Sequence, residues 1–210
     1  SHDLRTPLVS ITGTLSYLKD EINSDKDLVR YNLVQGAYEE ANRLNRLVSN
    51  LLEMSRLQAG SRLLKRELYD VFEVISVARS QLKDSLDNRD LIITVEEDLP
   101  LISVDLTLFS LVLINLLDNA TKYSAPDTAI NIRAYQVQDI VYLEVEDSGI
   151  GISEEQLPHI FERFYRAATT NGKPGSGLGL PICKGIIDLH GGTIQVNTHG
   201  GGSKFIISCS

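Results

Sequence analysis

The most informative stretch of this chain is LTLFSLVLINLLDNATKY, residues 106–123. Its length and apolar content predict a strongly apolar helix. Asn115, Asn119 and Lys122 follow at intervals of four and three residues, which places them on one face of that helix. Asn is a poor helix former and burying unpaired amides is unfavourable, so a bound ligand or cation would explain them. The alternative is an amphipathic polar face with nothing bound. A carbonyl of Asn119 suits Mg²⁺, and Lys122 suits phosphate.

Downstream, apolar and polar residues alternate in the segment Val141–Asp147. Asp147 falls at an odd position of this alternation, on the same side of the strand as the apolar residues. This pattern predicts a strand that directs a carboxylate toward its own buried face. Gly149 and Gly151 follow directly and let backbone approach closely, so Asp147 could accept a hydrogen bond from the amino group of a flat ring. The alternative is an ordinary Asp-Ser-Gly turn at a strand end.

A glycine-rich stretch, GKPGSGLGL at residues 172–180, leads into a predicted helix. The first amides and the positive dipole end of such a helix suit phosphate. It is not a Walker loop, because Lys173 precedes the glycines and no Gly-Lys-Ser/Thr occurs. It is not a Rossmann fingerprint either, because Gly175, Gly177 and Gly179 have no strand just ahead of them. Alone it could be a mobile linker. Together with the polar helix face and Asp147, it would complete a nucleotide site, with groups for the nucleobase, the metal ion and the phosphates.

The first sixty residues have a different pattern. Apolar residues from Leu4 to Ile22 recur at intervals of three and four, as in helices that pack on other helices. A second apolar stripe runs from Leu33 to Leu51 and ends near Gly60. Residues 1–60 are therefore predicted to form an antiparallel helical hairpin. Two helices make a thin core, so we expect a homodimer with a four-helix bundle.

Residues 61–210 are predicted to form a second domain, an α+β sandwich with a helical layer on one face. The expected strands are Arg62–Leu68, Leu91–Glu96, Ala129–Gln136, Ile140–Asp147, Thr193–Asn197 and Lys204–Ser208. The expected helices are Val71–Leu86, Leu106–Tyr123, Glu154–Tyr165 and Leu178–Leu189.

Charge and composition restrict the partners. Asp and Glu number 28 against 20 Lys and Arg, a net charge of −8, so nucleic acid is not an expected partner. Cys183 and Cys209 are too few for a disulfide framework or a thiolate metal cage, which fits a reducing compartment. No apolar run approaches the roughly 20 residues of a membrane span. We expect the cytoplasmic portion of a longer protein that begins before Ser1 and is attached to the inner membrane elsewhere.

His2 falls on the water side of the first predicted helix, where an imidazole could act as a nucleophile. Asp3 could orient its ring, and Pro7 should bend the helix beside it. The alternative is a surface histidine without function. The other histidines lack the spacing of metal ligands and are expected at the surface or at helix ends: His159, His190 and His199.

Taken together, five segments resemble the sequence boxes of bacterial sensor histidine kinases. They occur in the order of that family, and the resemblance spans essentially all 210 residues. The segments are Ser1–Leu8 (H-box), Asn115–Tyr123 (N-box), Asp147–Ile152 (G1 box), Phe161–Arg166 (F-box) and Gly175–Leu180 (G2 box). The segments 51–54 and 182–188 also look similar to the potassium-responsive osmosensor branch.

The resemblance implies a dimerisation and phosphoacceptor hairpin joined to a Bergerat-fold ATP-binding domain, with ATP and Mg²⁺ as cofactors. His2 would take the γ-phosphate and pass it to an aspartate of a response regulator receiver domain, with Asp3 as base. Asn119 would ligate Mg²⁺, and Arg166 would approach the phosphates. The implied nucleotide contacts are Asn115, Asn119, Lys122, Tyr123, Asp147, Gly149, Gly151, Ile152, Phe164, Lys173, Gly175, Ser176, Gly177, Leu178, Gly179 and Leu180.

Thr6 lies one helical turn after His2, where the family residue positions a water that removes phosphate from the regulator. The resemblance thus implies a phosphatase activity as well; the alternative is that Thr6 bonds local backbone ahead of Pro7. Two departures are minor: Asp3 stands where Glu is commoner, and Ser203 stands where the last box usually has Thr. Two other functions remain open, a conformational ATPase of the same fold and a degenerate kinase that serves as a dimeric binding module.

Overall fold

In a computed structural model, the chain divides into two compact units, Ser1–Ser61 and Arg62–Ser210. It describes residues 11–16, 18, 31–38, 41, 44, 48, 52, 55, 64–86, 89–167, 176–199 and 201–209. Five of the predicted site residues lie outside these ranges: His2, Asp3, Thr6, Lys173 and Gly175. In the first unit, residues 11–16 and 31–38 are helical, as the apolar stripes predict. No helix within the described ranges is long and apolar enough to cross a membrane.

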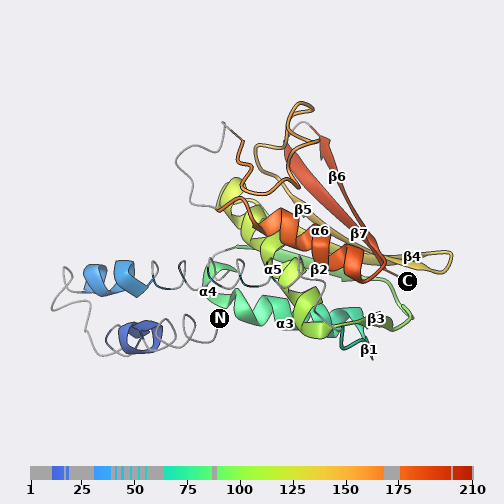
Figure 1. The fold of residues 1–210 in the computed structure, drawn as a ribbon, viewed down its shortest axis with the longest axis horizontal. Helices are drawn as coiled ribbons and strands as arrows, with labels where there is room; N and C mark the ends of the chain where they lie inside the picture. The colour runs from blue at the N-terminus through green and yellow to red at the C-terminus, as the bar shows by residue number, and fades with distance from the viewer. Residues whose placement is uncertain are drawn as a thin grey trace. The chain divides into compact units, whose positions relative to one another are not determined.

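The second unit carries the strands and most of the core (Figure 1). In chain order its elements are β1 (Glu67–Tyr69), α3 (Val71–Gln81), α4 (Lys83–Leu86), β2 (Leu91–Val95), β3 (Ile102–Val104), α5 (Leu106–Tyr123), β4 (Ile130–Val137), β5 (Ile140–Asp147), α6 (Gly179–Leu189), β6 (Thr193–His199) and β7 (Gly202–Cys209).

The main sheet has the strand order β2-β4-β5-β7-β6. Strand β2 runs parallel to β4, and the other neighbours are antiparallel. A separate two-stranded sheet pairs β1 with β3. Strands β4 and β5 form a tight hairpin, in which Gln138 adopts a positive φ of 56°. The long register of β5 against β4 and β7 makes it the central strand, which fixes the position of the residues that follow its end.

The core lies between this sheet and a layer of helices on one of its faces (Figure 1). Helix α5 packs against both α3 and α6 and against β5. Its buried side chains include Phe109, Leu113 and Leu117, which have no exposed surface. The strands contribute alternate residues to the same core, as in the buried Val141, Leu143 and Val145 of β5. The predicted α+β architecture, with helices on one face, is therefore confirmed.

One predicted helix is wrong. Residues 154–164 form a series of turns, in which amides bond carbonyls three residues back, from His159 to Gln156 at 2.9 Å and from Glu162 to His159 at 2.8 Å. Pro158 explains the difference, because it has no amide hydrogen and disfavours helical backbone in the residue before it. The apolar spacing of this segment resembles that of a helix, but the backbone cannot continue through the proline.

Other differences are smaller. The strand expected at Arg62–Leu68 is shorter in the structure. It consists of β1 alone and ends at Tyr69, because residues 64–66 do not pair with another strand. Its partner β3 was not expected, because three residues after a proline give no readable alternation. The helix expected at Val71–Leu86 is divided at Leu82 into α3 and α4. The strand expectations for β2, β4, β6 and β7 are right in type and differ only at their ends.

His190, at the end of α6, joins two helices in the core. Its Nδ1 donates to the Ile186 carbonyl at 2.8 Å, and its Nε2 accepts from the backbone amide of Asp105 at 3.0 Å. Asp105 in turn caps the start of α5 by accepting from Leu108 at 3.1 Å. Burial lowers the pKa of His190 below its ordinary value. The expectation of a helix-end histidine is confirmed, but the residue is buried, whereas His159 is exposed.

We expect acid to destabilise this domain through His190. Protonation would put a hydrogen on Nε2, which faces the Asp105 amide. Because the folded-state pKa lies below 6.5, the unfolded chain takes up more protons as the pH falls below that value, so stability is complete above it and declines in acid. His190→Gln should lower the free energy of unfolding by about 1–3 kcal/mol near neutral pH and reduce this decline.

The measurement is urea unfolding followed by circular dichroism at several pH values between neutral and mildly acidic. The control is His159→Gln, since His159 is exposed and its described contacts, with Glu162 and the Tyr165 ring, lie within its own segment. That variant should keep the decline of the parent chain. An equal decline in His190→Gln and in the parent chain would show that another group causes the acid sensitivity.

Candidate functional site

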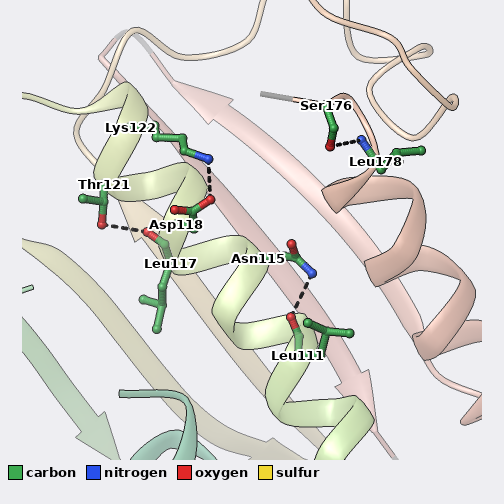
Figure 2. Close-up of polar contacts among 8 residues, drawn as sticks. All are labelled: Leu111, Asn115, Leu117, Asp118, Thr121, Lys122, Ser176 and Leu178. Atoms are coloured by element: carbon green, nitrogen blue, oxygen red, sulfur yellow. Dashed lines mark hydrogen bonds and ion pairs between the residues drawn. The ribbon is translucent and has the colours of Figure 1, made fainter. Parts of the chain in front are cut away.

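The predicted nucleotide residues that the structure describes come from five segments of the second unit. These are the polar face of α5, the end of β5, the loop at residues 148–152, the turn segment at Phe164, and residues 176–180 at the start of α6. Figure 2 shows the Asn115 amide and the Lys122–Asp118 ion pair on α5, and Ser176 with Leu178, which lead into α6. The approach of Asn115 to Gly179 and the bridge between Ser124 and Gly149 bring segments that are distant in the sequence together.

Asn115 links α5 to α6. Its amide nitrogen donates to the Leu111 carbonyl at 3.0 Å, so this half-buried amide has a partner in its own helix. Its Oδ1 faces Gly179, 3.2 Å from the position that a Cβ there would occupy. Because its amide nitrogen is paired within the helix, Asn115 does not require a ligand. The inference that a bound group must satisfy buried amides on α5 therefore does not apply to this residue. It remains at the border of the site through its contact with the first residue of α6.

Lys122 forms an ion pair with Asp118, one turn earlier on α5 (Figure 2). Both side chains are partly exposed, at 27% and 20%. A phosphate bound by Lys122 would therefore compete with the Asp118 carboxylate. Asn119, next to this pair in the sequence, is half-buried. The face predicted from the four- and three-residue spacing is present, and it carries one acidic group that the sequence argument left out.

Asp147 ends β5 on the buried side of the sheet. Its exposed fraction is 8%, and its neighbours Val145 and Leu143 at the same parity are buried, as the alternation predicts. One carboxylate oxygen, Oδ1, accepts from the amide of Gly149 at 2.8 Å. Burial raises the pKa of Asp147, while hydrogen bonds from the amides of Gly149 and Ser203 act in the opposite direction. A carboxylate is thus held in a largely dehydrated place with its direction fixed by backbone.

Gly149 lies so close to the end of α5 that no other residue fits. A Cβ at this position would be 2.5 Å from the Tyr123 carbonyl oxygen and 2.7 Å from Oδ1 of Asp147. Gly149 also pairs with Ser124 in an isolated bridge, and the Ile150 amide donates to the Tyr123 carbonyl at 3.3 Å. The loop after β5 is therefore built directly on the last turn of α5, with Tyr123 half-buried beneath it.

Thr198 on β6 holds the second half of that loop. Its hydroxyl accepts from the Ile152 amide at 3.1 Å and donates to the Gly202 carbonyl at 3.2 Å. A Cβ at Gly151 would lie 3.0 Å from the same hydroxyl oxygen. No sequence pattern pointed to Thr198, because it lies 46 residues after Ile152 and belongs to no motif.

Gly177 joins the F-box segment to the glycine-rich segment. It adopts a positive φ of 69°, and a Cβ would lie 2.6 Å from the backbone of Phe164. The Phe164 amide donates to the Gly177 carbonyl at 2.9 Å, while the Phe164 side chain is exposed. Ser176 accepts from the amide of Leu178, which is buried at the start of α6. Both the conformation and the close contact require glycine here.

Of the remaining predicted residues, Ile152, Gly179 and Leu180 are half-buried and Arg166 is exposed after the turn segment. Within the described ranges, no group of three or more His, Cys, Asp or Glu could hold a metal ion by itself. Two further residues act on Asp147: Arg89 before β2, which no sequence pattern indicated, and Ser203 on β7, to which the sequence assigned no role at the site. Neither belongs to one of the five boxes as quoted.

Comparison with known proteins agrees with this geometry. Residues 104–210 match the family described as histidine kinase-, DNA gyrase B-, and HSP90-like ATPase, and residues 1–60 match the His kinase A (phospho-acceptor) domain. The chain is similar to the sensor protein KdpD of Clostridium acetobutylicum, with 38% identity over 98% of this chain and 23% of that protein. It thus spans about a quarter of the length of this relative.

Two solved structures are similar over nearly the whole chain. The histidine kinase AdeS of Acinetobacter baumannii has 29% identity and a TM-score of 0.67, covering 100% of this chain and 98% of that one. The histidine kinase ThkA, solved in complex with the response regulator protein TrrA, has 27% identity and a TM-score of 0.68, covering 99% and 58%. Since the phospho-acceptor and ATPase matches follow one another in the order of the five boxes, the chain belongs to the sensor histidine kinase family.

Proposed function

We propose that this chain is the catalytic core of a two-component histidine kinase, which binds ATP with Mg²⁺, phosphorylates His2 and passes the phosphoryl group to an aspartate of a response regulator. The observation that carries the proposal is the buried Asp147 carboxylate, held by the Gly149 amide at the end of α5. The match of residues 1–60 to a phospho-acceptor domain favours a kinase over a conformational ATPase, which would not need His2.

Asp147 is suited to bind adenine. A carboxylate that accepts two backbone amides keeps further lone pairs for another donor, and the exocyclic amine of adenine is such a donor. Its burial strengthens a hydrogen bond to it by excluding competing water. Gly149 brings backbone without a side chain next to the carboxylate and fixes its direction. Specificity for adenine over guanine follows, since guanine presents an oxygen at the corresponding position.

Asn119 is the residue that would hold Mg²⁺. It is half-buried on the polar face of α5, and its amide oxygen is a hard ligand. Mg²⁺ usually takes one or two protein oxygens and completes its shell with substrate phosphates and water, so a single amide fits it without an acidic cluster. When bound, the ion would neutralise negative charge on the phosphates. The start of α6 at Gly179 would present backbone amides to the same phosphates.

In the proposed reaction, a ring nitrogen of His2 attacks the γ-phosphorus of ATP. A nitrogen–phosphorus bond forms, the bond from that phosphorus to the bridging oxygen breaks, and ADP leaves with the electron pair. The imidazole proton passes to Asp3. In the second reaction, a carboxylate oxygen of the regulator attacks the phosphorus, the nitrogen–phosphorus bond breaks with its electron pair on the imidazole, and the proton held by Asp3 returns to restore neutral His2. Transfer to a regulator is supported by the ThkA structure, which contains such a protein.

We also propose that the chain is a homodimer through its helical unit. Among the described residues of the two predicted stripes, four large apolar side chains are exposed in the single chain: Ile11 at 50%, Leu18 at 39%, Leu33 at 69% and Leu44 at 47%. Covering them with a second hairpin would remove this apolar surface from water. The similarity to KdpD supports the further proposal that the parent protein belongs to the potassium-responsive branch, while its attachment to a membrane stays a prediction.

One test of the proposed function concerns His2. Incubated with γ-labelled ATP and Mg²⁺, the chain should acquire label that is lost in acid and survives base, as expected of a phosphorus–nitrogen bond. His2→Gln should abolish the labelling and leave nucleotide affinity near that of the parent chain, because His2 and Asp147 lie in different units. Base-stable label that persists in His2→Gln would place the phosphoacceptor elsewhere.

Asp147→Asn should weaken ATP binding by about 1.5–3 kcal/mol, the range for a hydrogen bond to a charged group. In the parent chain, affinity should fall in acid, and at a higher pH than for an ordinary aspartate, since the raised pKa protonates the acceptor earlier. Asp147→Asn should lose that component of the pH profile. Calorimetric titration with ATP measures both effects.

The matched control is Glu146→Gln, an acid on the same strand that lies on the other face and pairs with Lys204. It should bind ATP nearly as the parent chain does. If Asp147→Asn and Glu146→Gln bind ATP equally well, the base is held at another place.

Asn119→Ala should keep part of the nucleotide affinity and lose the Mg²⁺-dependent labelling.

Thr6→Ala tests the phosphatase activity. A hydroxyl can orient a water by hydrogen bonding without taking part in the attack by His2. The variant should therefore label itself nearly as well as the parent chain and remove phosphate from the phosphorylated regulator more slowly. Both rates are measured on the same preparation. Equal losses in the two rates would make Thr6 a structural residue.

A further inference from the structure

Arg89, which precedes β2, binds the C-terminal end of α5 with both arms of its guanidinium group. Nη1 donates to the Ser124 hydroxyl and to the Thr128 carbonyl at 3.5 Å. Nη2 donates to the carbonyls of Thr121 at 3.3 Å and Ser124 at 3.5 Å. The side chain is half-buried. Carbonyls at a helix C-terminus lack partners within the helix and carry the negative end of its dipole, so a fixed cation there is favourable.

The backbone that Arg89 holds also supports the Asp147 loop. Ser124 pairs with Gly149, and the Gly149 amide donates to Oδ1 of Asp147 at 2.8 Å. The next amide, that of Ile150, donates to the Tyr123 carbonyl. One continuous set of hydrogen bonds therefore runs from the guanidinium group through the end of α5 to the carboxylate. A shift of Ser124 would be transmitted to the direction of that carboxylate.

Arg89 also acts on Asp147 by its charge. Glu146, the next residue, disfavours the ionised carboxylate by repulsion, and Arg89 favours it by attraction. From β7, the Ser203 amide favours the ionised form as well. The other charged groups on the elements packed against β5 contact partners of their own: Lys122 with Asp118 on α5, Lys204 of β7 with Glu144 and Glu146, and Arg133 of β4 over the Tyr135 ring.

We propose that Arg89 is a positioning residue for the nucleotide site, which fixes the end of α5 against the loop that directs the Asp147 carboxylate toward the adenine amine. The inference rests on the proposed role of Asp147 in binding adenine. Arg89 acts through Ser124 and Asp147 rather than on the nucleotide. Its two contributions, the planar set of donors and the positive charge, are separable by substitution.

The test measures ADP affinity by calorimetry from neutral to acidic pH in Arg89→Met and Arg89→Lys. Arg89→Met loses both donors and charge, so ADP should bind on the order of tenfold more weakly, and the pH at which affinity falls should move upward. Arg89→Lys keeps the charge without the planar donors, so affinity should fall while that pH stays near the value of the parent chain. Titration of the ADP phosphates is common to all variants and does not affect the comparison.

The matched control is Arg133→Met, which removes an exposed arginine from β4. It should leave both the ADP affinity and its pH profile unchanged. A double substitution isolates the coupling: in the Asp147→Asn background, Arg89→Met should weaken ADP binding much less than in the parent chain, because its effect passes through the carboxylate. A residue that only stabilises the fold would reduce affinity by the same factor in both backgrounds.

Each outcome is decisive. If Asp147→Asn weakens ADP binding but folded Arg89→Met matches the parent chain in affinity and pH profile, the positioning role is wrong and the proposed adenine contact stands. If Asp147→Asn itself has no effect, the adenine contact fails first. If Arg89→Met does not fold, Arg89→Lys decides: affinity equal to that of the parent chain would overturn the positioning role, and weakened binding with an unshifted pH profile would support it.

Discussion

The contact between the last turn of α5 and the loop after β5 is the constraint on which the site depends. The Tyr123 carbonyl bonds the Ile150 amide, Ser124 pairs with Gly149, and a Cβ at Gly149 would overlap the Tyr123 carbonyl oxygen. This approach brings the polar face of α5 beside a carboxylate that a strand directs inward. Without it, the helix would carry amides and the strand an acid, but the two would not form one site.

The surrounding structure holds that contact in place from several sides. Helix α5 is capped at its start by Asp105, which His190 of α6 binds in turn, and its end is held by Arg89. Polar groups thus fix both ends of a helix whose middle is fixed by apolar packing against α3, α6 and β5. The arrangement agrees with an enzyme that must hold a base and phosphates at fixed separation, since misplacement of reacting groups slows transfer steeply.

The sequence patterns that predicted the structure correctly were those that repeat over many residues. The eighteen-residue helix α5 and the eight-residue strand β5 have the predicted bounds, because each buries a continuous apolar face at a single period. The segment 154–164 failed because one proline overrides several apolar residues, and β3 was missed because three residues show no period. The boxes of the site could be recognised from the sequence, because their glycine, asparagine and acidic residues occupy positions where core packing would favour apolar residues.

Sequence alone determined the family order of the boxes, the buried parity of Asp147 and the shared face of Asn115, Asn119 and Lys122, because these follow from local periods of the backbone. The structure added that Asn115 donates to a carbonyl of its own helix and that Lys122 is paired with Asp118, both between residues four positions apart. It also brought in Arg89, Thr198 and Ser203. Arg89 bonds residues 32 or more positions away and Thr198 bonds Ile152, 46 positions away, and such contacts depend on sheet order and helix packing, which no local pattern encodes.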